Sequence, residues 1–209
     1  PGLWEIENLD LIMLHPYGTT DNLTTLLSTT NSRYDKPAVA GEFSYSWKPA
    51  RSDEAADFER ELKLGLWRGL MSPTPILPMT WWWEYHDSRD DWRYFQPIAG
   101  FSHKMTVLND SEWRPLSLEM ENDNIECLGI AIDNRLFLWV HNRSDSTVSN
   151  VEIKIKEITS GIYKTRQFST LTGQPIDAES ELPQVANGAL SFSIPSIDGN
   201  HDTSFVITR

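Results

Sequence analysis

The sequence contains one cysteine, Cys127, among 209 residues. A single thiol cannot form an intrachain disulfide or a cysteine-rich metal site, so neither is expected. No run approaches the roughly 18 apolar residues of a membrane-spanning helix. No signal peptide is present, but the chain begins with Pro1 rather than Met, so an upstream piece is expected to have been removed. No Gly-rich phosphate loop and no Gly-x-Ser-x-Gly elbow occurs, and we expect no cofactor.

Positive charge is also scarce. The chain has 18 Lys and Arg against 30 Asp and Glu, which gives a net charge of −12. Nucleic-acid backbones and anionic membranes would repel such a chain, so neither is expected as a partner. A neutral ligand is favoured. The nine Trp residues suit sugar rings as well as protein cores, because indole combines a flat apolar face with one hydrogen-bond donor.

Residues 1–110 alternate strand-like and helix-like patterns, which is typical of a parallel sheet with crossover helices. The order is strand, helix, strand, helix, strand, helix, expected at 9–14, 23–27, 36–41, 52–69, 76–81 and 94–108. Pro78 lies inside the third strand and removes a backbone donor, so we expect irregular pairing there.

Residues 111–209 change to a period of two with polar turns and no good helix, which predicts a small antiparallel β-sandwich. Its seven expected strands are 116–120, 125–132, 135–141, 151–157, 162–168, 189–194 and 203–207. Asp133 and Asn134 tolerate positive φ and predict a two-residue hairpin turn. Phe137 and Trp139 alternate with smaller or polar residues and are interpreted as core.

A carboxylate follows the second expected strand. The segment Lys36–Glu42 reads KPAVAGE, a short apolar run that ends in Glu42. Carboxylates seldom lie at the mouth of a packed core unless their charge is used, and catalytic groups sit at the C-terminal ends of barrel strands. Glu42 is therefore the candidate catalytic residue, although a solvated loop glutamate would give the same pattern.

A second group of polar residues could suggest a metal site. None of the spacings matches a recognised site, so a solvated acidic loop without metal is the favoured interpretation. The residues are Glu84, His86, Asp87, Asp90, Asp91 and His103.

Several motifs resemble one known family in their order. They are His15-Pro16-Tyr17, KPAVAGEF, LWRGLMS, PMTWWWEYHD and YFQPIAGF. This order resembles the last three βα units of the clan A glycoside hydrolases, the cellulase-like and mannanase-like (β/α)₈ barrels, over residues 9–108. The resemblance implies an α/β plus all-β chain: the C-terminal part of a TIM barrel, strands six to eight, followed by an antiparallel β-sandwich.

The resemblance also implies roles for individual residues. Glu42 matches the nucleophile of a retaining glycosidase that acts on a β-linked polysaccharide or oligosaccharide, and Tyr17 would donate a hydrogen bond to it. One of Trp81 and Trp82 matches the aromatic floor under the sugar. The residues at substrate-binding positions are His15, Tyr17, Trp47, Trp81, Trp82 and Glu84. Trp47 and Glu84 fit ordinary rim structure at least as well.

One half of the expected catalytic machinery is missing. In this clan the acid/base glutamate follows an asparagine, and the sequence contains no Asn-Glu pair. Strands one to five are also absent, and a (β/α)₈ barrel closes only with eight strands. The expected partners are therefore a carbohydrate substrate and a missing N-terminal barrel half, supplied by the same precursor or by a second chain, and the isolated chain is expected to be inactive.

A second interpretation stays open: a noncatalytic carbohydrate-binding or interaction module in which the half barrel is vestigial. The acidic charge and the expected polysaccharide substrate favour an exported bacterial protein. The sugar, the linkage and the choice between endo and exo cleavage do not follow from the sequence, because this fold hosts many activities.

Overall fold

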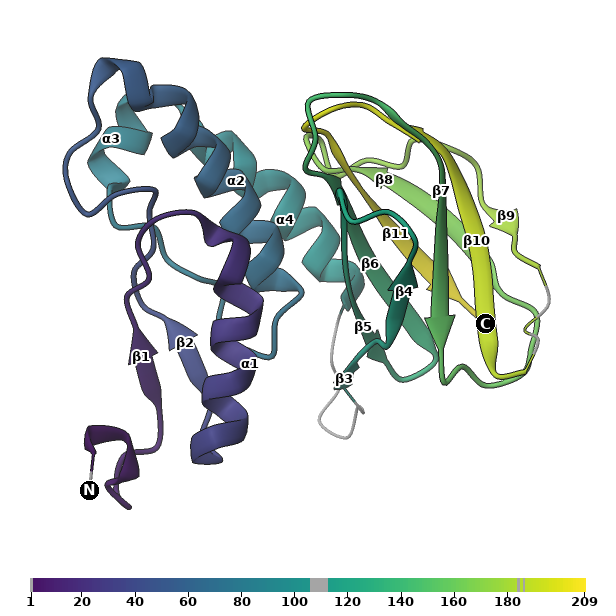
Figure 1. Ribbon diagram of the computed structural model, residues 1–209, viewed down its shortest axis with the longest axis horizontal. Coiled ribbons are helices and arrows are strands. Elements are labelled where there is room, and N and C mark those ends of the chain that lie inside the picture. The colour runs from purple at the N-terminus through teal and green to yellow at the C-terminus, as the bar shows by residue number, and fades with distance from the viewer. Residues whose placement is uncertain (1, 106–112, 184, 186) are drawn as a thin grey trace. The chain divides into compact units, whose positions relative to one another are not determined.

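The computed structural model describes residues 2–105, 113–183, 185 and 187–209. The chain divides into two compact units, Pro1–Ile98 (unit 1) and Ala99–Arg209 (unit 2) (Figure 1). The described residues form 11 strands in three sheets, one in unit 1 and two in unit 2. The expected boundary between residues 110 and 111 lies outside the described residues.

The sheet of unit 1 is small and parallel. Strand β1 (Ile12–Leu14) pairs with β2 (Ala38–Ala40), with Ile12 opposite Ala38. All three residues of β2 are buried, as expected for small and β-branched residues covered on both faces. On β1, by contrast, Met13 is half exposed.

A third extended segment continues this sheet without forming a regular strand. Phe43, just beyond β2, makes a parallel bridge with Thr80, and its N–H donates to the Met79 carbonyl at 2.8 Å. Pro78 offers no N–H to the ladder. The irregular pairing predicted for this segment is therefore confirmed.

Helices connect the three extended segments. Helix α2 buries Phe58, Leu62 and Leu66, which recur at four-residue steps along one face. A Cβ at Gly65 would overlap the Phe43 ring, so glycine lets this helix lie close to the sheet. The helices of the described residues are η1 (Leu3–Glu5), η2 (Thr20–Asn22), α1 (Leu23–Tyr34), η3 (Ser52–Glu54), α2 (Ala55–Leu70), α3 (Trp83–Ser88), η4 (Asp91–Tyr94), α4 (Phe95–Ser102) and η5 (His103–Met105).

Two helices differ from the sequence prediction. Helix α1 is longer than the expected 23–27, because it continues through the polar residues 28–33, which show no apolar pattern, and ends where Asp35 adopts a left-handed φ of 51°. The expected helix 94–108 divides into η4, α4 and η5, and residues 106–108 lie outside the described part. Among the described residues, no helix is long and apolar enough to cross a membrane.

Unit 2 contains two antiparallel sheets with strand orders β3-β5-β6-β11-β8-β9 and β10-β7-β4. Their bounds are β3 (Trp113–Pro115), β4 (Leu118–Met120), β5 (Ile125–Ile132), β6 (Arg135–Asn142), β7 (Val148–Lys156), β8 (Lys164–Ser169), β9 (Ser180–Glu181), β10 (Ala189–Ile197) and β11 (Asp202–Thr208). Each of the seven expected strands coincides with one of these. The short edge strands β3 and β9 were not predicted.

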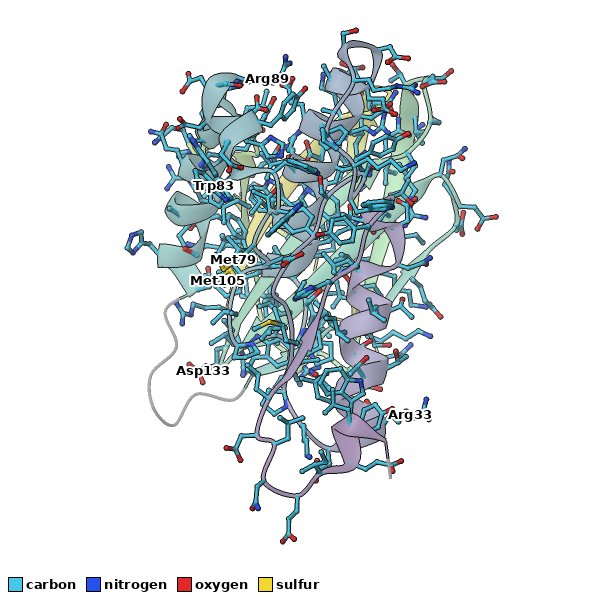
Figure 2. All side chains as sticks on the ribbon, turned by 90° about the vertical axis from the view of Figure 1, so that its left-hand side faces the viewer. Arg33, Met79, Trp83, Arg89, Met105 and Asp133 are labelled. Atoms are coloured by element: carbon cyan, nitrogen blue, oxygen red, sulfur yellow. The ribbon has the colours of Figure 1, made fainter. Side chains whose placement is uncertain are left out.

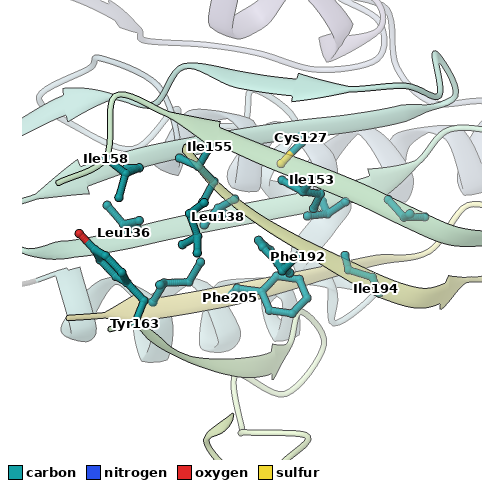
Figure 3. Close-up of a cluster of buried hydrophobic side chains, with 14 of the residues drawn as sticks. Cys127, Leu136, Leu138, Ile153, Ile155, Ile158, Tyr163, Phe192, Ile194 and Phe205 are labelled. Carbon is teal, nitrogen blue, oxygen red and sulfur yellow. The ribbon is translucent and has the colours of Figure 1, made fainter. Parts of the chain in front are cut away.

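The core of unit 2 draws buried side chains from both sheets. Leu138 on β6 and Phe205 on β11 belong to the same cluster as Ile153 on β7 and Phe192 on β10 (Figure 3). This shared cluster explains why the period-two pattern was so clear, because every second side chain of each strand faces the opposite sheet.

Two further predictions concern the burial of Phe137 and Trp139 and the hairpin turn between β5 and β6. Phe137 and Trp139 are fully buried, and the Phe101 ring packs edge-on against Phe137 at 6.0 Å. The turn between β5 and β6 does use the predicted pair of residues, and Asp133 has a φ of 53°.

Candidate active site

The three extended segments of unit 1 end at the same edge of the sheet. Tyr17, after β1, makes a parallel bridge with Ser44, after β2. The N–H of Trp81, at the end of the third segment, donates to the Phe43 carbonyl at 3.0 Å. Because the carboxyl ends of parallel strands meet at one edge, Glu42 lies between Tyr17 and Trp81 along this edge.

A short hydrogen bond joins the two residues that the sequence paired. The Tyr17 hydroxyl donates to Oε2 of Glu42 at 2.5 Å. Nδ1 of His15 lies 3.4 Å from the same oxygen. His15 and Tyr17 are two residues apart in extended chain, so both point to the same side. The side chains of Glu42 and His15 are 26% and 45% exposed, so a ligand can reach them.

Tyr17 is held in the protonated state. Burial, together with the hydrogen bond and the negative charge of Glu42, raises the pKa of Tyr17 to about 12. At neutral pH the phenol therefore acts as a donor, and it fixes one oxygen of the carboxylate.

A buried polar network anchors the loop that carries Tyr17. The N–H and hydroxyl of Thr20 both donate to Oε2 of Glu61, at 2.7 and 2.8 Å. Arg68 donates to the Thr20 hydroxyl at 2.6 Å and to Asp21 at 2.8 Å. Glu61 and Arg68 are 2% and 0% exposed, so α2 holds the loop through charges away from water. The sequence analysis missed this network.

Exposed indoles lie next to the edge of the sheet that carries Glu42. Trp81 and Trp47 are 43% and 66% exposed. The Trp82 indole N–H donates to the Ser46 carbonyl at 2.8 Å, which ties the segment after β2 to the third segment. Trp81 and Trp82 meet edge to face with ring centroids 6.3 Å apart. Indole faces of this kind can stack on the apolar face of a sugar ring.

Glu84 is placed differently from the residues above. It lies exposed in the first turn of α3, beside Trp83, and no hydrogen bond or ion pair joins its side chain to another described residue. Trp83 and Met79, both labelled in Figure 2, are also exposed, at 56% and 60%. The structure thus brings together His15, Tyr17 and Glu42 through direct contacts, whereas no hydrogen bond or ion pair links Glu84 to them.

The prediction of a solvated acidic loop is wrong in part. His86 and Asp91 are buried, at 1% and 0% exposed, and Nδ1 of His86 lies 3.0 Å from Asp91 Oδ2. Arg93 also pairs with Asp91, at 3.3 Å, and this clamp joins α3 to η4. Asp87 and Asp90 are exposed as expected. Within the described part of the chain, no group of three or more His, Cys, Asp or Glu side chains is arranged to hold a metal ion.

Comparison with protein-family models gave no match, and comparison with curated proteins gave none. Solved structures do match. A GH30 endoxylanase from Clostridium papyrosolvens C71 superposes with a TM-score of 0.54 at 13% identity, over 97% of this chain and 50% of that one. A glucosidase from Croceicoccus marinus gives 0.55 at 11% identity, over 96% and 54%.

The chain shares the fold of these two solved structures. It spans about half the length of the solved structures it matches, in their C-terminal part. The resemblance predicted from the sequence is therefore confirmed. At 13% and 11% identity the likeness establishes the fold alone.

Proposed function

We propose that this chain carries the nucleophile of a retaining glycoside hydrolase that acts on a β-linked polysaccharide or oligosaccharide. The observation that supports this most is the 2.5 Å hydrogen bond from Tyr17 to Glu42 where the parallel segments end. A carboxylate held by a neutral phenol, open to solvent and close to indoles, suits attack on a sugar.

The chemistry assigns each group a task. A Glu42 oxygen attacks the anomeric carbon while the bond to the leaving oxygen breaks, and the leaving oxygen takes a proton from a separate carboxylic acid. Water then attacks the anomeric carbon of the glycosyl ester and gives its proton to the conjugate base of that acid, which releases the sugar and restores both the Glu42 carboxylate and the acid. Tyr17 orients Glu42, His15 lines the same pocket, and the indole of Trp81 or Trp82 stacks under the sugar. Trp47 and Glu84 lie at the rim.

The acid/base residue belongs in this proposal to polypeptide outside this sequence. Retaining enzymes need two carboxyl groups about 5–5.5 Å apart, and the chain has no Asn-Glu pair to supply the second. Unit 1 would form strands six to eight of a (β/α)₈ barrel, and the half-exposed Met13 and Met79 would face the strands supplied from elsewhere. Unit 2 would be the accessory β-sandwich, and the complete enzyme would be exported.

Covalent trapping tests the proposal. The complete enzyme that contains this chain is incubated with dinitrophenyl 2-deoxy-2-fluoro-β-cellobioside or the matching xylobioside. Dinitrophenolate leaves without a proton, so the label reports the nucleophile independently of the acid. We expect one sugar on the peptide that contains Glu42, and none in Glu42→Gln. Label on another carboxylate, or saccharide binding without any label, would refute the proposal, and the latter would support a noncatalytic module.

A further inference from the structure

Unit 2 has a cavity at one side of its two sheets. There β8 and β9 end the six-stranded sheet, and β10 ends the three-stranded sheet. The cavity between these strands has a volume of about 160 Å³. All its lining residues belong to unit 2, so it is separate from the Glu42 site.

The floor of the cavity is apolar. Phe192 and Phe205 belong to the core, and their rings meet edge to face with centroids 5.6 Å apart (Figure 3). They are 7% and 5% exposed, and Leu182 and Ile194 lie beside them. Such a floor favours the C–H face of a ligand over a charged group.

The wall of the cavity is polar in a position where the core pattern requires apolar residues. Thr165 and Gln167 are opposite Ile207 and Phe205 in the ladder with β11, so they lie on the face of β8 that carries core side chains. Ser180 on β9 is opposite Thr165 in turn. These three side chains offer uncharged hydroxyl and amide groups, which donate and accept hydrogen bonds. Asp177 also lines the cavity and adds one carboxylate, which accepts hydrogen bonds from hydroxyls.

One of these groups lacks a partner. The Thr165 hydroxyl is buried, and no described residue forms a hydrogen bond with it. The amide of Gln167, in contrast, is fixed by donation to the Thr203 hydroxyl at 2.8 Å. Burying an unsatisfied hydroxyl is unfavourable, so Thr165 would gain from a hydrogen bond to a ligand hydroxyl once its side chain rotates towards the cavity.

We propose that this cavity binds one ring of a neutral saccharide, and that unit 2 is therefore a noncatalytic sugar-binding module. A pyranose has C–H groups for the Phe192 and Phe205 floor and hydroxyls for Thr165 and Gln167. The volume of about 160 Å³ lies below the about 300–1,000 Å³ of pockets that enclose drug-sized ligands, so one ring fits at a time. The net charge of −12 disfavours polyanions as the ligand.

Calorimetric titration of the whole chain with cellohexaose and with xylohexaose tests this. Ser180→Trp fills the cavity, whereas Glu181→Trp, the matched control, adds the same side chain at the next residue of β9, which does not line it. Thr165→Val removes only the unpartnered hydroxyl. The double variant Trp81→Ala/Trp82→Ala removes two indoles beside Glu42 in unit 1 and leaves the cavity intact.

We expect Ser180→Trp to weaken binding of at least one hexasaccharide more than tenfold, and Glu181→Trp to change it less than twofold. Thr165→Val should weaken it about three- to tenfold, the range for one hydrogen bond, without lowering the unfolding temperature. If Ser180→Trp disturbs folding, the binding measured for Thr165→Val tests the proposal in its place. No binding by the unmodified chain, unchanged binding in Thr165→Val, or loss only in the Trp81/Trp82 variant would overturn the proposal. Labelling of Glu42 is a separate measurement, so either proposal can fail alone.

Discussion

Replacing Tyr17 by Phe removes one hydroxyl from the candidate active site and little else. The hydroxyl donates to Glu42 at 2.5 Å, and a hydrogen bond to a charged acceptor contributes about 1.5–3 kcal/mol. Because the Glu42 side chain is 26% exposed, water replaces part of this interaction, and we take the lower part of the range, about 1.5–2 kcal/mol. At 1.36 kcal/mol per tenfold, glycosylation should slow about 10- to 30-fold.

The assay is the rate at which the dinitrophenyl 2-fluoro glycoside labels the complete enzyme. Tyr94→Phe is the matched control, because Tyr94 also donates to a glutamate of unit 1, Glu59 on α2, which is not among the residues in contact with Glu42. We expect Tyr17→Phe alone to slow labelling, with a loss in the free energy of unfolding no larger than the about 1.5–2 kcal/mol of the hydrogen bond itself. Equal rates for Tyr17→Phe and the unmodified enzyme, or equal losses in both variants, would refute the orienting role of Tyr17.

Three further predictions concern the chain itself. The phenolate absorbance attributable to Tyr17, obtained by difference from Tyr17→Phe, should have a midpoint near 12 rather than 10. Because this pKa is raised on folding, the stabilisation it provides is complete below pH about 10 and is lost as the pH rises towards 12; a midpoint near 10 contradicts this. Gly65→Ala should destabilise unit 1 by about 1–3 kcal/mol in urea unfolding, because the new methyl group overlaps Phe43, whereas Gly100→Ala, which has room, should not; equal effects would contradict the close packing. Arg68→Met should lower the free energy of unfolding by about 3–5 kcal/mol, because its guanidinium is fully buried among polar partners; a change below 1 kcal/mol would show that the network is not holding the loop.

The sequence predicted best what short-range patterns encode. The period-two pattern located seven strands of unit 2, because each strand buries alternate side chains in one shared core. The short apolar run before Glu42 correctly predicted strand β2 and the position of Glu42 just after it. Strands β3 and β9 escaped prediction because they have three and two residues, all exposed, and so carry no apolar alternation.

Contacts between distant polar residues could not be predicted in the same way. Glu61 accepts a hydrogen bond from Thr20, which is 41 residues away in the sequence. Glutamate and threonine are also common on solvated helix faces and in loops, so the sequence alone gave no sign of this contact. His86 and Asp91 are only five residues apart, yet their burial depends on how α3 and η4 pack. An acidic pattern alone does not distinguish a solvated loop from a buried ion pair, and the sequence analysis chose the wrong alternative for these two residues.

The buried network under the Tyr17 loop and the short Tyr17 bond belong to one physical argument. Replacing buried charges by apolar residues of the same volume is often neutral or stabilising, so stability alone does not account for Glu61 and Arg68. Their hydrogen bonds, unlike apolar contacts, require fixed directions, and they end on Thr20, three residues after Tyr17. A phenol that must hold one carboxylate oxygen at 2.5 Å needs a loop with little freedom to shift. The network supplies that restraint from α2, and its buried members Glu61 and Arg68 are screened by salt much less than surface charges are.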